Sequence, residues 1–116
     1  MQFYNNSQEI DMEFLSKEFN TSQGAVNLVM QTPESVVQGY DASGTPAYRV
    51  QPLNYRPDEA VHEYRFDWFP GSVVFYVDGQ QVYRMTENIP VDPGRMFRSI
   101  LATVLLILFE YVQFGT

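Results

Sequence analysis

Residues 62–79 of this 116-residue chain read HEYRFDWFPGSVVFYVDG, and this stretch predicts antiparallel strands. Apolar and charged residues alternate strictly through residues 62–68, which is the period of a half-buried strand. The alternation puts four aromatic side chains on one face: His62, Tyr64, Phe66 and Trp68. We expect this face to lie in the core, and His62 to be a hydrogen-bonded structural histidine rather than a catalytic one.

The second half of the same stretch predicts a β-hairpin. A turn at Pro70-Gly71 leads into a β-branched and aromatic run at residues 72–77. Asp78-Gly79 follows, and this pair is typical of a two-residue hairpin turn because both central residues need positive φ. Residues 81–86 are the expected return strand.

Outward from this stretch, the rest of the chain also predicts short strands and loops. Alternating or apolar runs predict strands at 9–15 and 25–31, with 36–40 as a further candidate, and loops at 41–44 and 54–58. No convincing amphipathic helix and no internal repeat is present. Tyr40, Tyr48 and Tyr55 fall in or beside the loops, where they are candidates to flank a cleft. Antiparallel strands at this spacing predict an all-β sandwich or barrel.

Composition narrows the classes of function. Seven basic against 14 acidic side chains give a net charge of −7, which disfavours binding to nucleic acid or to an anionic membrane. The chain has no cysteine, and its single histidine, His62, excludes a histidine cluster. We therefore expect no cofactor and no metal site of that kind. A hydrophobic content of 45% and an aromatic content of 16% fit one packed, β-rich domain that binds a neutral, polyhydroxylated ligand.

One strand concentrates acidic residues. Glu9, Asp11 and Glu13 lie at positions i, i+2 and i+4, so on a strand they share one face while the residues between them point into the core. Three aligned like charges repel one another and raise one another's pKa, which makes the row costly for a purely structural strand.

The spacing of the row suggests a reaction. The outer α-carbons are roughly 13 Å apart, so two glutamates that lean together bring their carboxyl groups to about 5 Å. A separation of about 5 Å is expected for a retaining glycosidase, whereas an inverting enzyme needs roughly 6.5–9.5 Å to admit water. Asp11 would then tune the pair, either by holding a shared proton or by hydrogen-bonding the nucleophile. An acidic solvent face and a calcium site built from carboxylate oxygens are the alternatives.

A resemblance favours the catalytic hypothesis. Residues 8–15, QEIDMEFL, resemble the E-x-D-x-E signature of glycoside hydrolase family 16, the lichenase and laminarinase group. Residues 62–68, Pro70 and residues 74–79 are similar to the H-x-Y-x-x-D-W…P…FYVDG segment of that family, in order and spacing. The resemblance covers residues 8–97 and is strongest to fungal members.

The resemblance implies a fold and a set of roles. It implies a concanavalin A-like jelly roll with Glu9 as the nucleophile, Asp11 as the assisting carboxylate and Glu13 as the general acid/base. Asn27 matches a position from which the family presents an asparagine to the substrate. Val29 replaces the aromatic residue that the family has two positions further on. The expected activity is hydrolysis of β-1,3- or β-1,3-1,4-glucan with retention, and a cell-wall transglycosylase and an inactive or lectin-like glucan-binding module are the alternatives.

Several departures from the family shape the remaining expectations. Only seven residues precede the signature and the matching register breaks after residue 97, so we expect an incomplete family domain at 1–97 and a divergent apolar tail at 98–116. Two N-x-[ST] sequons, at Asn5 and Asn20, and the family point to an extracellular or cell-wall protein, although no signal peptide begins at Met1. We expect a monomer whose partner is polysaccharide. The sequence does not settle the glucan linkage or a structural calcium.

Overall fold

The computed structural model describes residues 2–5, 8–89 and 95–96 of the chain. Strands dominate these residues: β1 (Gln2–Asn5), β2 (Gln8–Glu13), β3 (Gly24–Gln31), β4 (Tyr48–Leu53), β5 (Tyr64–Phe69), β6 (Ser72–Val77), β7 (Gln80–Met85) and β8 (Arg95–Met96). A 3₁₀ turn, η1 (Ser16–Glu18), follows β2, and one short helix, α1 (Pro33–Val37), follows β3. The predicted all-β class is confirmed.

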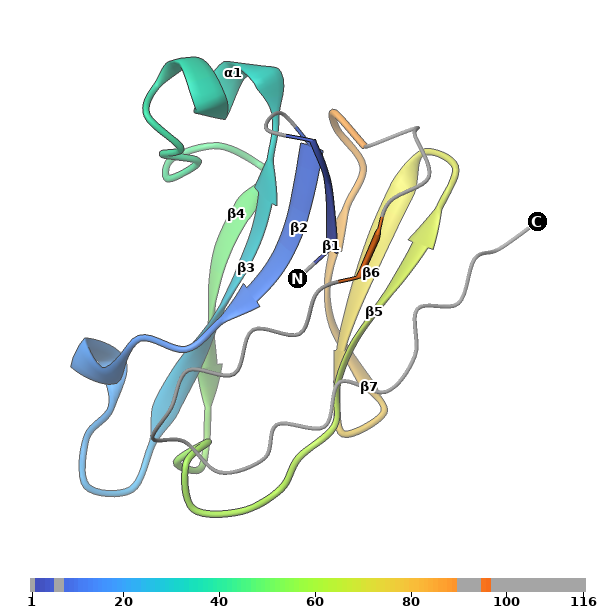
Figure 1. Cartoon of the computed structure of the whole chain (residues 1–116). Helices are drawn as coiled ribbons and strands as arrows, with labels where there is room; N and C mark the ends of the chain where they lie inside the picture. Colours follow the sequence, from blue (N-terminus) through green and yellow to red (C-terminus); the bar gives the residue numbers. More distant parts are fainter. Residues whose placement is uncertain (1, 6–7, 90–94, 97–116) are drawn as a thin grey trace.

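The strands form two antiparallel sheets that face each other (Figure 1). One sheet has five strands in the order β4-β3-β2-β1-β8, and the other has three in the order β5-β6-β7. Alternate residues of both sheets, among them Ile10, Leu28 and Phe75, meet in one buried core. This arrangement is the predicted antiparallel sandwich.

The predicted hairpin at residues 72–86 is confirmed. Strand β6 covers the predicted range, and Asp78 and Gly79 both have positive φ, at 49° and 79°. The Asp78 carboxylate also accepts a hydrogen bond from the Glu63 amide at 2.9 Å, which ties the turn to the start of β5. The aromatic face of β5 is buried as expected, with Tyr64, Phe66 and Trp68 each at most 8% exposed.

One predicted strand is wrong, because residues 33–37 form α1 instead of part of a strand at 36–40. Thr32 caps this helix: its hydroxyl accepts from the Ser35 amide, and the Ser35 hydroxyl accepts from the Thr32 amide. Pro33 occupies the first turn, where its missing N–H costs nothing. These local bonds outweigh the β preference of the two valines that end the helix.

Strand β4 is not among the predicted strands, because its residues lie between the predicted loops and include Pro52. Among the described strands β4 lies at the edge of its sheet, next to β3 only. Proline is tolerated there because an edge strand need not donate from every amide. The predicted tail at 98–116 lies outside the described residues.

Candidate carboxylate site

The three predicted carboxylates lie on β2 and point away from the core. Ile10 and Met12, which alternate with them, are 0% and 6% exposed inside the sandwich. Glu9, Asp11 and Glu13 therefore occupy the outer face of the five-stranded sheet, as the alternation predicts. We call them the carboxylate row.

Strand β3 lies directly beside the row. Its register pairs Glu9 with Gln31, Asp11 with Val29 and Glu13 with Asn27. Paired residues of an antiparallel ladder project from the same face, so the β3 side chains border the row. Asn27 thus lies beside Glu13, the carboxyl group that the resemblance marks as the acid.

Asp11 is the most enclosed member of the row. It is only 3% exposed, and its Oδ1 atom accepts no hydrogen bond. Burial and repulsion from Glu9, with a smaller contribution from Glu13, raise its pKa to about 8. These surroundings therefore favour the protonated form of the Asp11 carboxyl group over the charged form.

Glu13 is the more exposed acid. Removal of water from its carboxyl group raises its pKa, and the negative charges of Glu9 and Glu18 raise it further. A carboxyl group in such surroundings keeps its proton to a higher pH than a free glutamate does, which suits proton donation.

Asn27 is fully buried, and both ends of its side-chain amide are engaged. Its Nδ2 donates to Glu18 Oε2 at 2.6 Å, and the Tyr48 hydroxyl donates to its Oδ1 at 2.6 Å. These two bonds fix the orientation of the amide, because only the nitrogen donates to a carboxylate and only the oxygen accepts from a phenol. We call Glu18, Asn27 and Tyr48 the Asn27 triad.

Glu18 was not expected at the site, and Tyr48 was expected only as one of three tyrosines that could flank a cleft. Glu18 lies on η1, a turn that no strand or helix period reveals. Tyr48 was only one of three loop tyrosines, but it lies on β4 directly opposite Val29. The alternating sequence of residues 48–53 was the signal that could have placed Tyr48 on a strand.

The other candidate aromatic residues lie apart from the row in the fold. His62 Nδ1 is 2.7 Å from Asp78 Oδ2, and its ring stacks on Tyr55 at 3.7 Å. These contacts belong to the ends of the three-stranded sheet and agree with a structural histidine. Tyr40 is 51% exposed beyond the end of α1.

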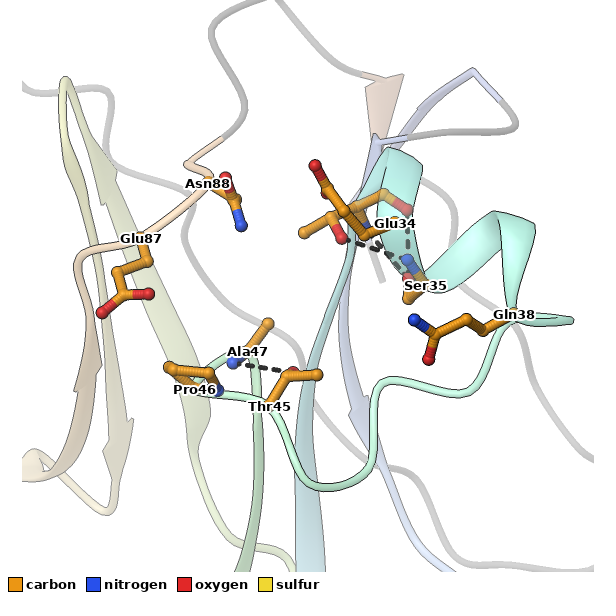
Figure 2. Close-up of a pocket in the computed structure, with 9 residues that line it drawn as sticks. Glu34, Ser35, Gln38, Thr45, Pro46, Ala47, Glu87 and Asn88 are labelled. Atoms are coloured by element: carbon orange, nitrogen blue, oxygen red, sulfur yellow. Dashed lines mark hydrogen bonds between the residues drawn. The ribbon is translucent and has the colours of Figure 1, made fainter.

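A separate pocket of about 220 Å³ lies between α1, the turn at residues 45–47 and residues 87–88 (Figure 2). Glu34 and Glu87 line it from two of these segments. No member of the carboxylate row or of the Asn27 triad lines this pocket, so it is distinct from the predicted site.

In the part of the chain that the structure describes, no group of three or more histidine or carboxylate side chains is arranged to hold a metal ion. None of the helices described there has the length and apolar character needed to cross a membrane.

The fold and the carboxylate row together define an all-β domain with an acidic centre on the outer face of one sheet. The family model described as glycosyl hydrolases family 16 matches residues 1–104. The chain therefore belongs to glycosyl hydrolase family 16.

Curated relatives agree with this assignment. The chain is 38% identical over 88 residues to a xylanase/beta-glucanase of Ruminococcus flavefaciens, a match that covers 76% of this chain and 9% of the relative. It is 34% identical over 92 residues to a beta-glucanase of Acetivibrio thermocellus, covering 79% of this chain and 24% of the relative. It is 32% identical over 93 residues to a beta-glucanase of Bacillus subtilis, and this match covers 79% of this chain and 33% of the relative.

The matched part is thus between 9% and 33% of the length of these relatives. No solved structure matches the chain significantly.

Proposed function

We propose that the protein is a glycoside hydrolase that cleaves β-glucan with retention of configuration. The observation that carries the proposal is the carboxylate row, in which Glu9, an enclosed Asp11 and Glu13 share one face of β2. Membership of family 16 and the names of the beta-glucanase relatives support the substrate class.

The proposed reaction has two displacements. Glu9 attacks the anomeric carbon while the protonated Glu13 gives its proton to the leaving glycosidic oxygen. Water then hydrolyses the glycosyl–Glu9 intermediate, with Glu13 taking a proton back from that water. The proton on Asp11 limits the negative charge next to Glu9, so the row does not carry three full charges at once.

Asn27 is proposed to border the substrate beside Glu13. Its amide is already bonded to Glu18 and Tyr48, so it reaches a sugar hydroxyl only where one of these bonds is shared or exchanged. Asn27→Ala should therefore raise KM for glucan.

Replacement of the two glutamates tests the mechanism. Glu9→Gln and Glu13→Gln should each lower kcat on β-1,3- or mixed-linkage glucan by at least about a thousandfold, because each removes a group that takes part in bond making. The exposed Glu34→Gln is the matched control and should retain full activity. Wild-type turnover by Glu9→Gln would rule out the proposed nucleophile.

Stereochemistry tests retention independently. Proton NMR of the first products should show the β-anomer before mutarotation. An initial α-anomer would mean inversion and would overturn the two-step mechanism.

Two other activities predict different products. A transglycosylase would form longer oligosaccharides at high acceptor concentration, whereas a binding module would bind glucan in calorimetry without releasing reducing ends. The protonated centre at Asp11 favours an enzyme over a binding module, because binding alone does not require an enclosed acid.

We further propose that the protein is extracellular or in the cell wall and acts as a monomer. Asn20, in the second sequon, is exposed, and its Oδ1 accepts from the amides of Ser22 and Gln23 at 2.9 Å. A turn of this kind at the surface is compatible with glycosylation. Loss of mass on deglycosylation of protein isolated from its source would support secretion.

A further inference from the structure

The Asn27 triad gives Glu18 a fixed place beside the acid of the carboxylate row. Glu18 lies on η1, which follows β2. Its carboxylate accepts a 2.6 Å hydrogen bond from Asn27 Nδ2, and Asn27 lies on β3, the strand that borders the row. Asn27 is paired with Glu13 in the ladder. The negative charge of Glu18 therefore stays near Glu13 as long as this bond is kept.

The second bond of the triad makes this placement rigid. Tyr48, from β4, donates to Asn27 Oδ1 at 2.6 Å, so the amide cannot rotate away from Glu18 without losing both partners. Asn27 is 0% exposed, and water cannot replace either partner without opening the site. An exposed surface glutamate would need no such support.

We infer that Glu18 is a positioning residue, whose negative charge, fixed by Asn27 and Tyr48, favours the protonated form of Glu13. This inference rests on the proposed function only for its consequence in catalysis. The electrostatic claim itself concerns two carboxyl groups and is measurable without substrate.

The charges around Glu13 are consistent with this role. Glu13 shares its face of β2 with Glu9 and Asp11. Glu18 of η1 and the Tyr48 phenol of β4 are the other titratable groups of the site, and β3 presents only uncharged residues to the row. Burial contributes most to the raised pKa of Glu13, followed by the charge of Glu9. The positive charge of the N-terminus acts in the opposite direction, and Glu18 makes the smallest of these contributions, which raises the pKa.

Glu18→Gln is the decisive variant. Its amide oxygen can still accept from Asn27 Nδ2, so the bond is kept while the charge is removed. The pH midpoint of the Glu13 side-chain carbon, followed by ¹³C NMR, should fall to a lower pH, as expected for loss of a nearby like charge. The exposed Glu34→Gln is the control and should leave the midpoint unchanged.

A second variant separates charge from geometry. Glu18→Asp keeps the charge but shortens the side chain, so its Glu13 midpoint should stay near that of the wild type. This variant also keeps the inference testable if Glu18→Gln does not fold, because a clear fall of the midpoint in Glu18→Asp would contradict the role of the charge.

The outcomes are distinct. An unchanged midpoint in Glu18→Gln, or an equal shift in Glu18→Asp, would overturn the inference. In an active enzyme, the alkaline limb of kcat/KM should move to lower pH in Glu18→Gln while the rate at low pH is kept; a purely structural residue would lower the rate at every pH. A shifted midpoint in a chain that hydrolyses no glucan would retain this inference and reject the proposed function.

Discussion

At the scale of single residues, the state of the site depends on Asp11. Its burial at 3% exposure disfavours the charged form, and its row neighbour Glu9 adds repulsion. The i, i+2, i+4 pattern alone predicted the repulsion, and it left a shared proton and a hydrogen bond to the nucleophile as the two roles for Asp11. The degree of burial was not predictable, because it depends on what packs over the outer face of the sheet.

Asp11→Asn should change how stability depends on pH. The native pKa of about 8 lies above the unfolded value of 3.8, so in the wild type the folded state binds more protons and loses stability as pH rises between these values. The asparagine variant carries no such proton. It should match the wild type near pH 4 and exceed it at pH 8, by an amount on the order of a few kcal/mol.

Urea unfolding at a series of pH values measures this difference. Asp41→Asn is a control of opposite sign, because hydrogen bonds from Ser43 lower the pKa of Asp41. That variant should gain nothing at pH 8. Parallel stability curves for Asp11→Asn and the wild type would contradict the assignment of the proton to Asp11.

Tyr48→Phe should destabilise the fold through one hydrogen bond. The change leaves the Asn27 Oδ1 atom buried without its donor, and an unsatisfied buried acceptor costs about 1–3 kcal/mol. Tyr40→Phe is the matched control, because Tyr40 is 51% exposed and should show almost no change. Equal free energies of unfolding for the two variants would mean that the triad contributes no stability.

At the scale of elements, strands with a clear period or a strong turn were predictable, and elements set by local bonds were not. The β6–β7 hairpin followed from alternation and the Asp78-Gly79 pair. Helix α1 depends on reciprocal bonds between Thr32 and Ser35, for which the sequence offers only hydroxyl residues beside a proline. Strand β4 contains Pro52, which is acceptable only because of its place in the sheet. Glu18 and the strand position of Tyr48 were not predictable for the same reason, since neither η1 nor β4 was expected.

Gly79→Ala tests the hairpin turn. Gly79 has a φ of 79°, and a Cβ there would meet no atom within 4 Å, so the cost is conformational rather than steric. We expect a loss of about 1 kcal/mol or more in the free energy of unfolding. Gln80→Ala, at the next exposed position, should change it much less. A neutral Gly79→Ala would mean that the turn relaxes to another type.

At the scale of the whole molecule, the core between the sheets holds the row on its outer face. Strand β2 presents Glu9 and Asp11 outward and buries Ile10 in the core. A shift of β2 by one residue in the ladder would exchange these two faces. The sheets also meet at one edge, where the Arg49 guanidinium of β4 lies 4.9 Å from the centre of the Tyr83 ring of β7. The sequence predicted the two layers from strand spacing, whereas this contact depends on how the two sheets pack together.

Phe75→Ala should therefore remove the fold and the site together. Phe75 is 0% exposed on the central strand β6 and packs on Phe66, with ring centres 6.2 Å apart. Truncation of a buried phenylalanine costs about 3–5 kcal/mol, a large part of the roughly 5–15 kcal/mol that stabilises a typical domain. Val37→Ala, at a side chain that is 87% exposed, should leave stability unchanged. Thermal unfolding by circular dichroism measures both variants.

Phe75→Leu separates the effect on the fold from the effect on the site. Its stability should fall between those of the two alanine variants, and its Asp11 carboxyl group should still titrate near pH 8. If Phe75→Leu kept its fold but lost that raised titration, the protonation of Asp11 would depend on the detailed packing of the core, and the outer face of the sheet would not be sufficient to set it.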